Sequence, residues 1–314
     1  MTLNAAYVGK VYPPTEPYLV GREKIREFAQ AIGDVNPVFH DLAAARALGL
    51  PDLMAPPTFP FVITMRAMNK AMFDPEIGLD YTRVVHGEQS FEYSRQLVAG
   101  DEVVVDASIE SIDSTGRNER LTVRAEVRTV AGEHVVTTRS VLVSRGTGAG
   151  GPAAATGRGS RDGGGRPGDT ARASGAQDGP VRPGDALATG TFRVERPDLI
   201  RYCGASGDFN PIHWNERVAT EVGLPNVIAH GMLTMAHAGQ VVTVWLGDPT
   251  RLESFSVRFT APVVVPDDGK GVKLGVALAL AEMPADGRVR LDLAAAVDGG
   301  AAVLDQAIAV VRGV

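Results

Sequence analysis

An internal repeat restricts the fold of this 314-residue chain more than any other feature of its sequence. Residues 33–37 read Gly-Asp-Val-Asn-Pro and residues 207–211 read Gly-Asp-Phe-Asn-Pro, so the two copies are 174 positions apart (from 34 to 208). The same offset, without a gap, aligns Gly-Leu-Pro at 49–51 with Gly-Leu-Pro at 223–225, and Ala55 with Ala229. Chance does not keep one register over a stretch of this length, so we infer an internal duplication.

The segment between the copies differs sharply in composition. Residues 146–184 are one third glycine, contain no aromatic residue and carry almost no large aliphatic side chain. Such a segment cannot bury enough apolar surface to offset the entropy lost on ordering, and compact domains rarely contain a loop of this length. We therefore predict three parts: a first domain at 1–145, a flexible linker at 146–184 and a second domain at 185–314.

Both copies show the same order of predicted elements, with helices first and strands after them. Helical spacing and turn residues predict the following segments in the first copy: helices at 22–32, 41–48 and 58–73, and strands at 83–97, 102–112, 119–130 and 134–143. In the second copy they predict helices at 198–203, 216–222 and 231–246, and strands at 251–260, 272–283, 289–297 and 301–311. This order favours an α+β fold, with a long apolar helix wrapped by an antiparallel sheet in each half. Two such halves would form a pseudo-dimer within one chain.

The positions at which the copies differ indicate which half carries chemistry. Phe39 stands in the first copy where His213 stands in the second, and Pro57 stands where the second copy has Gly231. The first copy therefore lacks a titratable imidazole, and proline removes a backbone N–H donor. We predict that only the second half is equipped for catalysis.

The second copy places a carboxylate five residues before an imidazole. Asp208 and His213 flank an Asn-Pro pair, which biases the backbone away from continuous helix and allows both side chains to face one point. A carboxylate and an imidazole that share a water molecule can activate it and return a proton to a neighbouring carbon. A purely structural hydrogen bond between the two residues is the alternative.

A second element lies at the start of the long helix at 231–246. The sequence there is Ala-His-Gly-Met, at 229–232, and Pro56 replaces His230 in the first copy. Backbone N–H groups in the first turn of a helix lack intrahelical partners, so the N–H of Gly231 can stabilise the oxyanion of a thioester enolate. Alternatively, His230 caps the helix and Gly231 only permits close packing.

These motifs resemble a known family. Residues 202–213, Tyr-Cys-Gly-Ala-Ser-Gly-Asp-Phe-Asn-Pro-Ile-His, and the Ala-His-Gly-Met at 229–232 resemble the hydratase motif of MaoC-like, (R)-specific enoyl-thioester hydratases. The first half resembles the degenerate dehydratase domain that accompanies this motif, through Ile-Gly-Asp at 32–34, Asn-Pro at 36–37, Ala-Pro-Pro-Thr-Phe at 55–59 and Gly-Asp at 100–101. The resemblance covers nearly the whole chain except the predicted linker, which is unusually long for the family.

The resemblance implies a double hot-dog fold and a hydro-lyase of fatty acid metabolism. The implied reaction is the reversible syn hydration of trans-2-enoyl thioesters to (3R)-hydroxyacyl thioesters. Asp208 and His213 would hold and deprotonate the water, or protonate the leaving hydroxyl in dehydration, and the Gly231 N–H would bind the thioester oxygen. Weaker candidates for binding the substrate or orienting the pair are Ser206, Asn210 and His230.

Composition and motifs exclude several other classes. The net charge of −6 argues against a nucleic-acid partner, and no apolar stretch is long enough for a membrane helix. A single cysteine, Cys203, and no secretory signal fit a cytoplasmic protein. No His or Cys cluster indicates a metal site, and no dinucleotide or phosphate-loop motif indicates a cofactor. We expect the partner to be an acyl-CoA or acyl-carrier-protein thioester, with neither carrier favoured.

Several alternatives stay open at this point. The rival functions are a non-catalytic acyl-thioester-binding module and a thioesterase on the same fold. The chain length of the substrate, the physiological direction and a homodimer of pseudo-dimers are also left open. His86, His134 and His237 have no partner at metal-ligand spacing, so we interpret them as structural or surface residues. Four side chains of the first long helix line either an acyl tunnel or an ordinary core: Phe61, Met65, Met68 and Met72.

Overall fold

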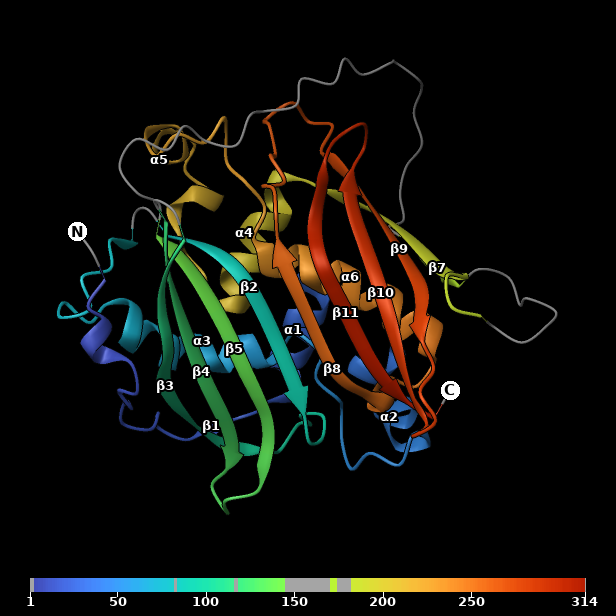
Figure 1. Cartoon of the computed structure of the whole chain (residues 1–314). Coiled ribbons are helices and arrows are strands. Elements are labelled where there is room, and N and C mark those ends of the chain that lie inside the picture. The colour runs from blue at the N-terminus through green and yellow to red at the C-terminus, as the bar shows by residue number, and fades with distance from the viewer. Residues whose placement is uncertain (1–2, 82–83, 116–117, 145–169, 174–181, 314) are drawn as a thin grey trace.

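The strands of both copies join a single antiparallel sheet in the computed structural model, which describes residues 3–81, 84–115, 118–144, 170–173 and 182–313 (Figure 1). The first copy contributes β1 (Tyr18–Leu19), β2 (Val84–Tyr93), β3 (Glu102–Thr115), β4 (Asn118–Thr129) and β5 (His134–Ser144). The remaining strands are β6 (Thr170–Ala173), β7 (Ala186–Val194), β8 (Leu252–Phe259), β9 (Val272–Glu282), β10 (Arg288–Val297) and β11 (Ala302–Arg312). Across the described residues their order is β1-β3-β4-β5-β2-β8-β11-β10-β9-β7-β6.

This order is a pseudo-twofold arrangement about the β2–β8 seam. Going outward, β5, β4, β3 and β1 on one side correspond to β11, β10, β9 and β7 on the other. At the seam Phe91 of β2 pairs directly with Phe255 of β8. Buried glutamines add hydrogen bonds between the halves, because Nε2 of Gln96 donates to the carbonyl of Leu252 (2.9 Å) and Nε2 of Gln240 donates to that of Ile32 (2.6 Å). The predicted pseudo-dimer is therefore one continuous sheet.

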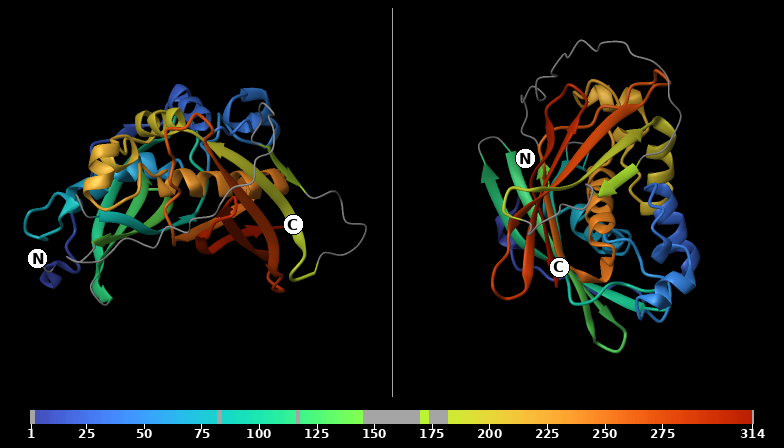
Figure 2. Two further views of the ribbon diagram at one scale, coloured as in Figure 1. Left: turned by 90° about the horizontal axis from the view of Figure 1, so that it is seen from above. Right: turned by 90° about the vertical axis from the view of Figure 1, so that its right-hand side faces the viewer.

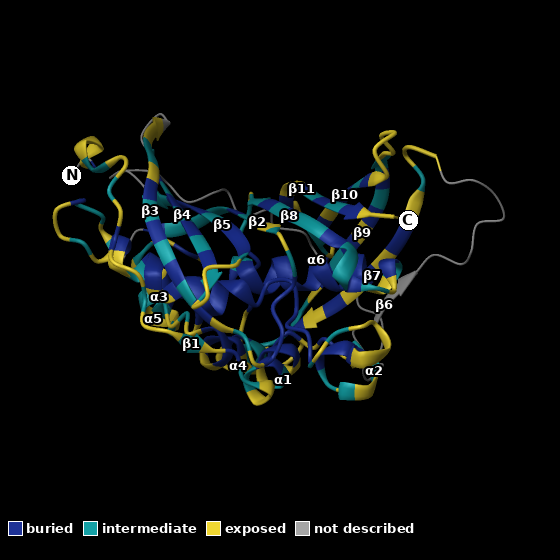
Figure 3. Cartoon of the chain, turned by 90° about the horizontal axis from the view of Figure 1, so that it is seen from below, coloured by how far each residue is buried: buried dark blue, intermediate teal, exposed yellow. Residues whose placement is uncertain are grey.

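The helices all lie on one side of the curved sheet, as Figure 2 shows. They are α1 (Arg22–Ala31), α2 (Leu42–Ala47), α3 (Pro60–Met72), α4 (Arg196–Ser206), α5 (Glu216–Glu221) and α6 (Gly231–Leu246). The two long helices, α3 and α6, lie against the sheet and beneath the other helices, and Figure 3 shows how deeply they are buried. Thirteen of the sixteen residues of α6 are buried, so this helix is covered on all sides, which explains its apolar character all round.

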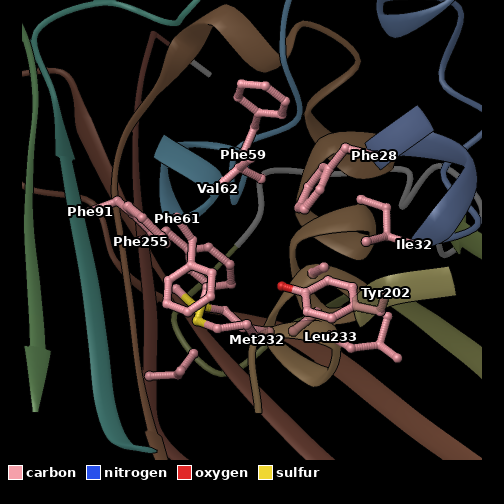
Figure 4. Close-up of a cluster of buried hydrophobic side chains, with 14 of the residues drawn as sticks. Phe28, Ile32, Phe59, Phe61, Val62, Phe91, Tyr202, Met232, Leu233 and Phe255 are labelled. Atoms are coloured by element: carbon pink, nitrogen blue, oxygen red, sulfur yellow. The ribbon is translucent and has the colours of Figure 1, made fainter. Parts of the chain in front are cut away.

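Equivalent residues of the two copies meet where α1 and α4 pack together. Phe28 and Tyr202 are 174 positions apart, and their rings contact each other with centroids 6.0 Å apart. Figure 4 shows these two rings in the apolar core together with Phe61 of α3, Phe91 of β2 and Phe255 of β8. Because both halves contribute to this core, each half covers apolar surface that the other would expose to water.

Several features differ from the sequence prediction, among them the short strand β1, which was not predicted, and β2, which ends at Tyr93 instead of at 97. The strand β7 was missed, because its Ala and Gly residues have weak strand propensity, although its burial alternates as in a half-buried strand. Helix α4 is longer than the predicted 198–203, with Pro197 in its first turn and Gly207 at its C-cap in the left-handed region (φ 81°). Helix α3 begins at Pro60, two residues after the predicted start.

Most of the predicted linker at 146–184 lies outside the described residues, so its flexibility stays a prediction. Within that range the structure describes β6, which pairs with β7, and the composition of the segment gave no signal for this strand. Among the described residues, no helix is both long and apolar enough to cross a membrane.

Candidate active site

Asp208 and His213 lie on the loop between α4 and α5, and local hydrogen bonds fix the shape of this loop. Gly207 ends α4, after which Oδ1 of Asp208 accepts a hydrogen bond from the backbone N–H of Asn210 (3.2 Å). The side chain of Asn210 in turn accepts from the N–H of Ile212 (3.3 Å) and caps the short 3₁₀ turn Pro211–His213. The Asn-Pro pair thus produces the sharp turn that the sequence predicts.

Ser206 holds the same loop from the end of α4. Its hydroxyl donates to the carbonyl of Tyr202 (2.6 Å) and accepts from the backbone N–H of Asp208 (3.2 Å). Ser206 and Asn210 therefore orient Asp208 through the backbone, and of these two residues only Asn210 reaches the cavity described below.

His213 presents one free ring nitrogen. Its Nδ1 lies 2.8 Å from the carbonyl oxygen of Ile228, and because a carbonyl only accepts, Nδ1 carries the proton and Nε2 has the lone pair. Burial lowers the pKa of His213 below its ordinary value, and the nearby Asp208 carboxylate opposes part of this shift. The neutral imidazole, which is the form that can accept a proton, is therefore favoured at neutral pH.

His230 connects the two residues. Its Nε2 donates to the carbonyl of Asp208 (3.2 Å) and lies 3.4 Å from Sγ of Cys203, and its ring stacks on that of His213 with centroids 3.7 Å apart. Burial, and then the neighbouring His213, hold the pKa of His230 well below its usual range. His230 is thus a neutral support for both Asp208 and His213, and its side chain does not cap α6.

Asp208 and His213 are not hydrogen-bonded to each other in the described structure. One potential ligand atom from each of Asp208, His213 and His230 lies within 4.8 Å of the others. A separation of this size between two acceptors suits a bridging water molecule. The structural hydrogen bond considered as an alternative for this pair is therefore absent, and the geometry fits a shared water.

Gly231 begins α6 and lines the same cavity as Asp208 and His213. A Cβ atom at this position would lie 3.0–3.1 Å from the ring of Phe259, tighter than an ordinary van der Waals contact. Close packing therefore accounts for a glycine here, and the N–H at this first turn lacks an intrahelical partner. The structure supports both readings of Gly231 together: it packs closely, and it offers a donor.

The cavity has a volume of about 230 Å³ and is built by both halves. The second half contributes its polar end, with Asp208, Asn210, His213 and Gly231. The first half contributes an apolar wall from α3, consisting of Phe61, Met65, Met68 and Met72. These four side chains are buried and thus belong to the core as well, but they do line the cavity. A pocket with apolar walls and a few convergent polar groups is typical of a small-molecule site.

Sequence reasoning missed two titratable residues of this cavity, both from the first half. Tyr81, which precedes β2, and His86, on β2, lie in the cavity wall. Burial, and then the charge of Asp208, raise the pKa of Tyr81, so its phenol stays protonated. His86 was interpreted as a structural or surface residue; the pairing of β2 with β8 brings it to the cavity wall, and no local pattern reveals such a contact.

The other two histidines of that group lie elsewhere. His134 contacts Glu126, Thr137 and Ser94 at 2.7–3.0 Å. His237 is buried in α6 and stacks on Phe192 with centroids 4.5 Å apart. Neither lines the cavity, in agreement with a structural role for both.

The equivalent place in the first half is closed. Asp34 is only 5% exposed. Nε2 of His40 lies 2.6 Å from the carbonyl oxygen of Asp34, just as Nε2 of His230 contacts the carbonyl oxygen of Asp208. Phe39 is fully buried where His213 would be, so the first half has no imidazole at the position of the proposed base. Burial raises the pKa of Asp34 to about 6.

This raised pKa predicts a pH-dependent stability. An acid with a higher pKa in the folded state than in the unfolded state stabilises the fold when it is protonated. For Asp34 the two pKa values are about 6 and 3.8, so the free energy of unfolding decreases as pH rises from 3.8 through 6. We expect Asp34→Asn, which is neutral and keeps an acceptor for Asn36, to raise the free energy of unfolding at pH 7 by at most about 3 kcal/mol. Denaturant unfolding at pH 4 and pH 7 measures this, and equal stability of the two proteins at pH 7 would contradict it.

Comparison with known proteins agrees with the division of the chain. The family described as FAS1-like, dehydratase domain region matches residues 6–138, and the family described as MaoC like domain matches residues 181–277. A UPF0336 protein of Streptomyces avermitilis is 56% identical over 145 residues, which cover 46% of this chain and 97% of that protein. This relative corresponds to the first half alone.

Solved structures match the whole chain. A protein described as a MaoC-like dehydratase is 32% identical, with a TM-score of 0.84 over 98% of this chain and 99% of its own. A Mycobacterium tuberculosis protein described as having a double hotdog fold has a TM-score of 0.64 at 17% identity, over 97% of this chain and 96% of its own. The predicted double hot-dog fold is thereby confirmed.

Proposed function

Because the chain belongs to the family of MaoC-like dehydratases, we propose that it catalyses the reversible hydration of trans-2-enoyl thioesters to (3R)-hydroxyacyl thioesters. Hydratase or dehydratase chemistry in general is what the family indicates, and the site supports this particular reaction. The observation that carries the proposal is the free Nε2 of His213 beside the Asp208 carboxylate, in the same cavity as Gly231.

In hydration, Asp208 and His213 hold one water molecule and remove a proton from it. The water oxygen then forms a bond to C3 of the enoyl chain, and the electron pair of the double bond moves toward the thioester carbonyl. The resulting enolate oxygen accepts a hydrogen bond from the Gly231 N–H, where the helix dipole also favours negative charge. The proton returns to C2, which completes the addition, and dehydration follows the same steps in reverse.

The first half supplies the place for the acyl chain. The wall formed by Phe61, Met65, Met68 and Met72 is apolar, and methionine side chains adapt to irregular apolar shapes. This gives the half without a base a role in substrate binding. The carrier of the acyl chain is either coenzyme A or an acyl carrier protein, and both are tested in the same assay.

The experiment supplies the purified chain with trans-2-enoyl thioesters of several lengths on both carriers, and measures loss of the double bond together with free thiol. Hydration consumes the double bond and leaves the thioester intact. Release of free thiol would instead favour a thioesterase, and tight binding without turnover would favour an acyl-thioester-binding module.

The pH dependence of hydration is a further expected result. His213 must be neutral to accept a proton, and its pKa lies below the ordinary value of 6.5 because of burial. We therefore expect kcat/KM to stay constant as pH falls from 8 through 6.5, and to decline only at lower pH, as His213 becomes protonated. A rate profile that already declines between pH 8 and 7 would contradict this assignment of the base.

The proposed steps use no metal ion, although Asp208, His213 and His230 form a set that can bind a divalent cation. We expect dialysis against a chelator to leave kcat unchanged. Added Zn²⁺ should inhibit by competing for the lone pairs that hold the water. Loss of activity on chelation, restored by a metal, would require a different mechanism.

A further inference from the structure

His86 is a polar residue in a part of the cavity wall that is otherwise mainly apolar. Its imidazole lies between two aromatic rings, stacked on Phe61 of α3 (centroids 5.8 Å apart) and edge-on to Phe259 of β8 (5.2 Å). Phe259 is also the ring against which Gly231 packs. The side chain is therefore clamped by both halves, close to the proposed oxyanion donor.

One nitrogen of this imidazole, Nε2, is buried without a hydrogen-bond partner in the described part of the chain. The ring also interacts with the backbone of Glu88 and the side chain of Gln89, which leaves Nε2 as the nitrogen available to a ligand. Burial lowers the pKa of His86 to about 4, against an opposing attraction from Asp208, so the ring is neutral at pH 7. A buried polar group without a partner costs roughly 1–3 kcal/mol, so the fold alone gives no reason for a histidine here.

No described side chain supplies the missing partner of Nε2. Val84, Leu142 and the methionines of α3 are apolar, and a saturated acyl chain lying along them would also leave Nε2 unpaired. An oxygen atom on that chain would satisfy Nε2: a hydroxyl group can donate to its lone pair or accept from its N–H, and a keto group can accept from its N–H.

We propose that His86 is a specificity-determining residue that hydrogen-bonds an oxygen substituent on the acyl chain, so that the protein favours oxygenated enoyl thioesters over unsubstituted ones of equal length. This inference rests on the proposed function and narrows its substrate class. It also gives the first half a share in substrate recognition beyond an apolar wall.

The test compares trans-2-enoyl-CoA substrates of one chain length, either unsubstituted or with a hydroxyl group at successive carbons beyond the double bond. For the wild-type protein we expect kcat/KM to be highest with one hydroxylated isomer, by roughly tenfold over the unsubstituted chain. His86→Phe keeps a ring between Phe61 and Phe259 but removes both nitrogens, so the ratio of kcat/KM for the hydroxylated and unsubstituted chains should fall to about one. Met65→Leu, which changes the same wall without a polar group, should retain the preference.

Two results would overturn the inference: a wild-type protein that prefers no hydroxylated isomer, or a His86→Phe protein that keeps the preference. The first comparison needs no variant, so it remains decisive if His86→Phe fails to fold. Wild-type turnover of the unsubstituted chain establishes the proposed function whatever the preference. If the wild-type protein hydrates no enoyl thioester at all, the proposed function fails and this inference fails with it.

Discussion

Replacing His213 by alanine, or Asp208 by asparagine, should lower kcat/KM for enoyl-thioester hydration by about 10²- to 10⁴-fold. His213→Ala removes the free Nε2 that is proposed to accept the proton of the water, and Asp208→Asn removes the negative charge beside it while keeping an acceptor for the Asn210 N–H. Initial rates with saturating and limiting substrate measure the effect, and a circular dichroism melt checks that each variant is folded.

The first half, which lacks an imidazole at the position of His213, provides the matched control for these substitutions. Asp34→Asn and His40→Ala change the equivalent loop in the first copy, where Phe39 occupies the position of the base. We expect kcat within a few-fold of the wild type for this double variant. Near-normal hydration by a folded His213→Ala or Asp208→Asn protein would remove the proposed mechanism.

The second large effect concerns Gly231. Gly231→Pro should reduce kcat by about 10²- to 10³-fold more than Gly231→Ala, because only proline removes the N–H that stabilises the enolate oxygen. Both variants add a Cβ atom against the ring of Phe259, so alanine controls for that steric effect. Proline is tolerated in the first turn of a helix, so α6 itself should persist.

Equal rates for the alanine and proline variants would show that the donor for the enolate oxygen lies elsewhere. Because both proteins carry the same contact with Phe259, the ratio of their kcat values reports on the N–H alone. A loss shared by both variants would instead measure the close packing at this position.

The sequence allowed prediction of those features that depend on local chemistry or on the duplication. The Gly-Asp-x-Asn-Pro turn is held by hydrogen bonds within a few residues, so the placement of Asp208 followed from the motif itself. The pseudo-dimer followed from the repeat, because two copies of one amphipathic unit bury their apolar faces against each other. The four apolar side chains of α3 were predicted to line either an acyl tunnel or the core, and in the structure they are buried and also line the cavity.

Features that depend on contacts between segments separated in the sequence were not predictable. His86 reaches the cavity only because β2 pairs with β8, and these strands are far apart in sequence. The stacking of His230 on His213 depends on the way α6 enters the core beside the catalytic loop, which no local pattern encodes. Strand β7 was missed because its pairing with β9, rather than its own residues, makes it a strand.

The most direct test of the whole account is product analysis after incubation of the purified chain with a trans-2-enoyl thioester in deuterium oxide. The account predicts a (3R)-hydroxyacyl thioester that carries one deuterium at C2, with no release of free thiol and with product formation by the His213→Ala protein slowed by at least about 10²-fold. Free thiol as the main product, a 3S alcohol, or an equal yield from the His213→Ala protein would contradict it.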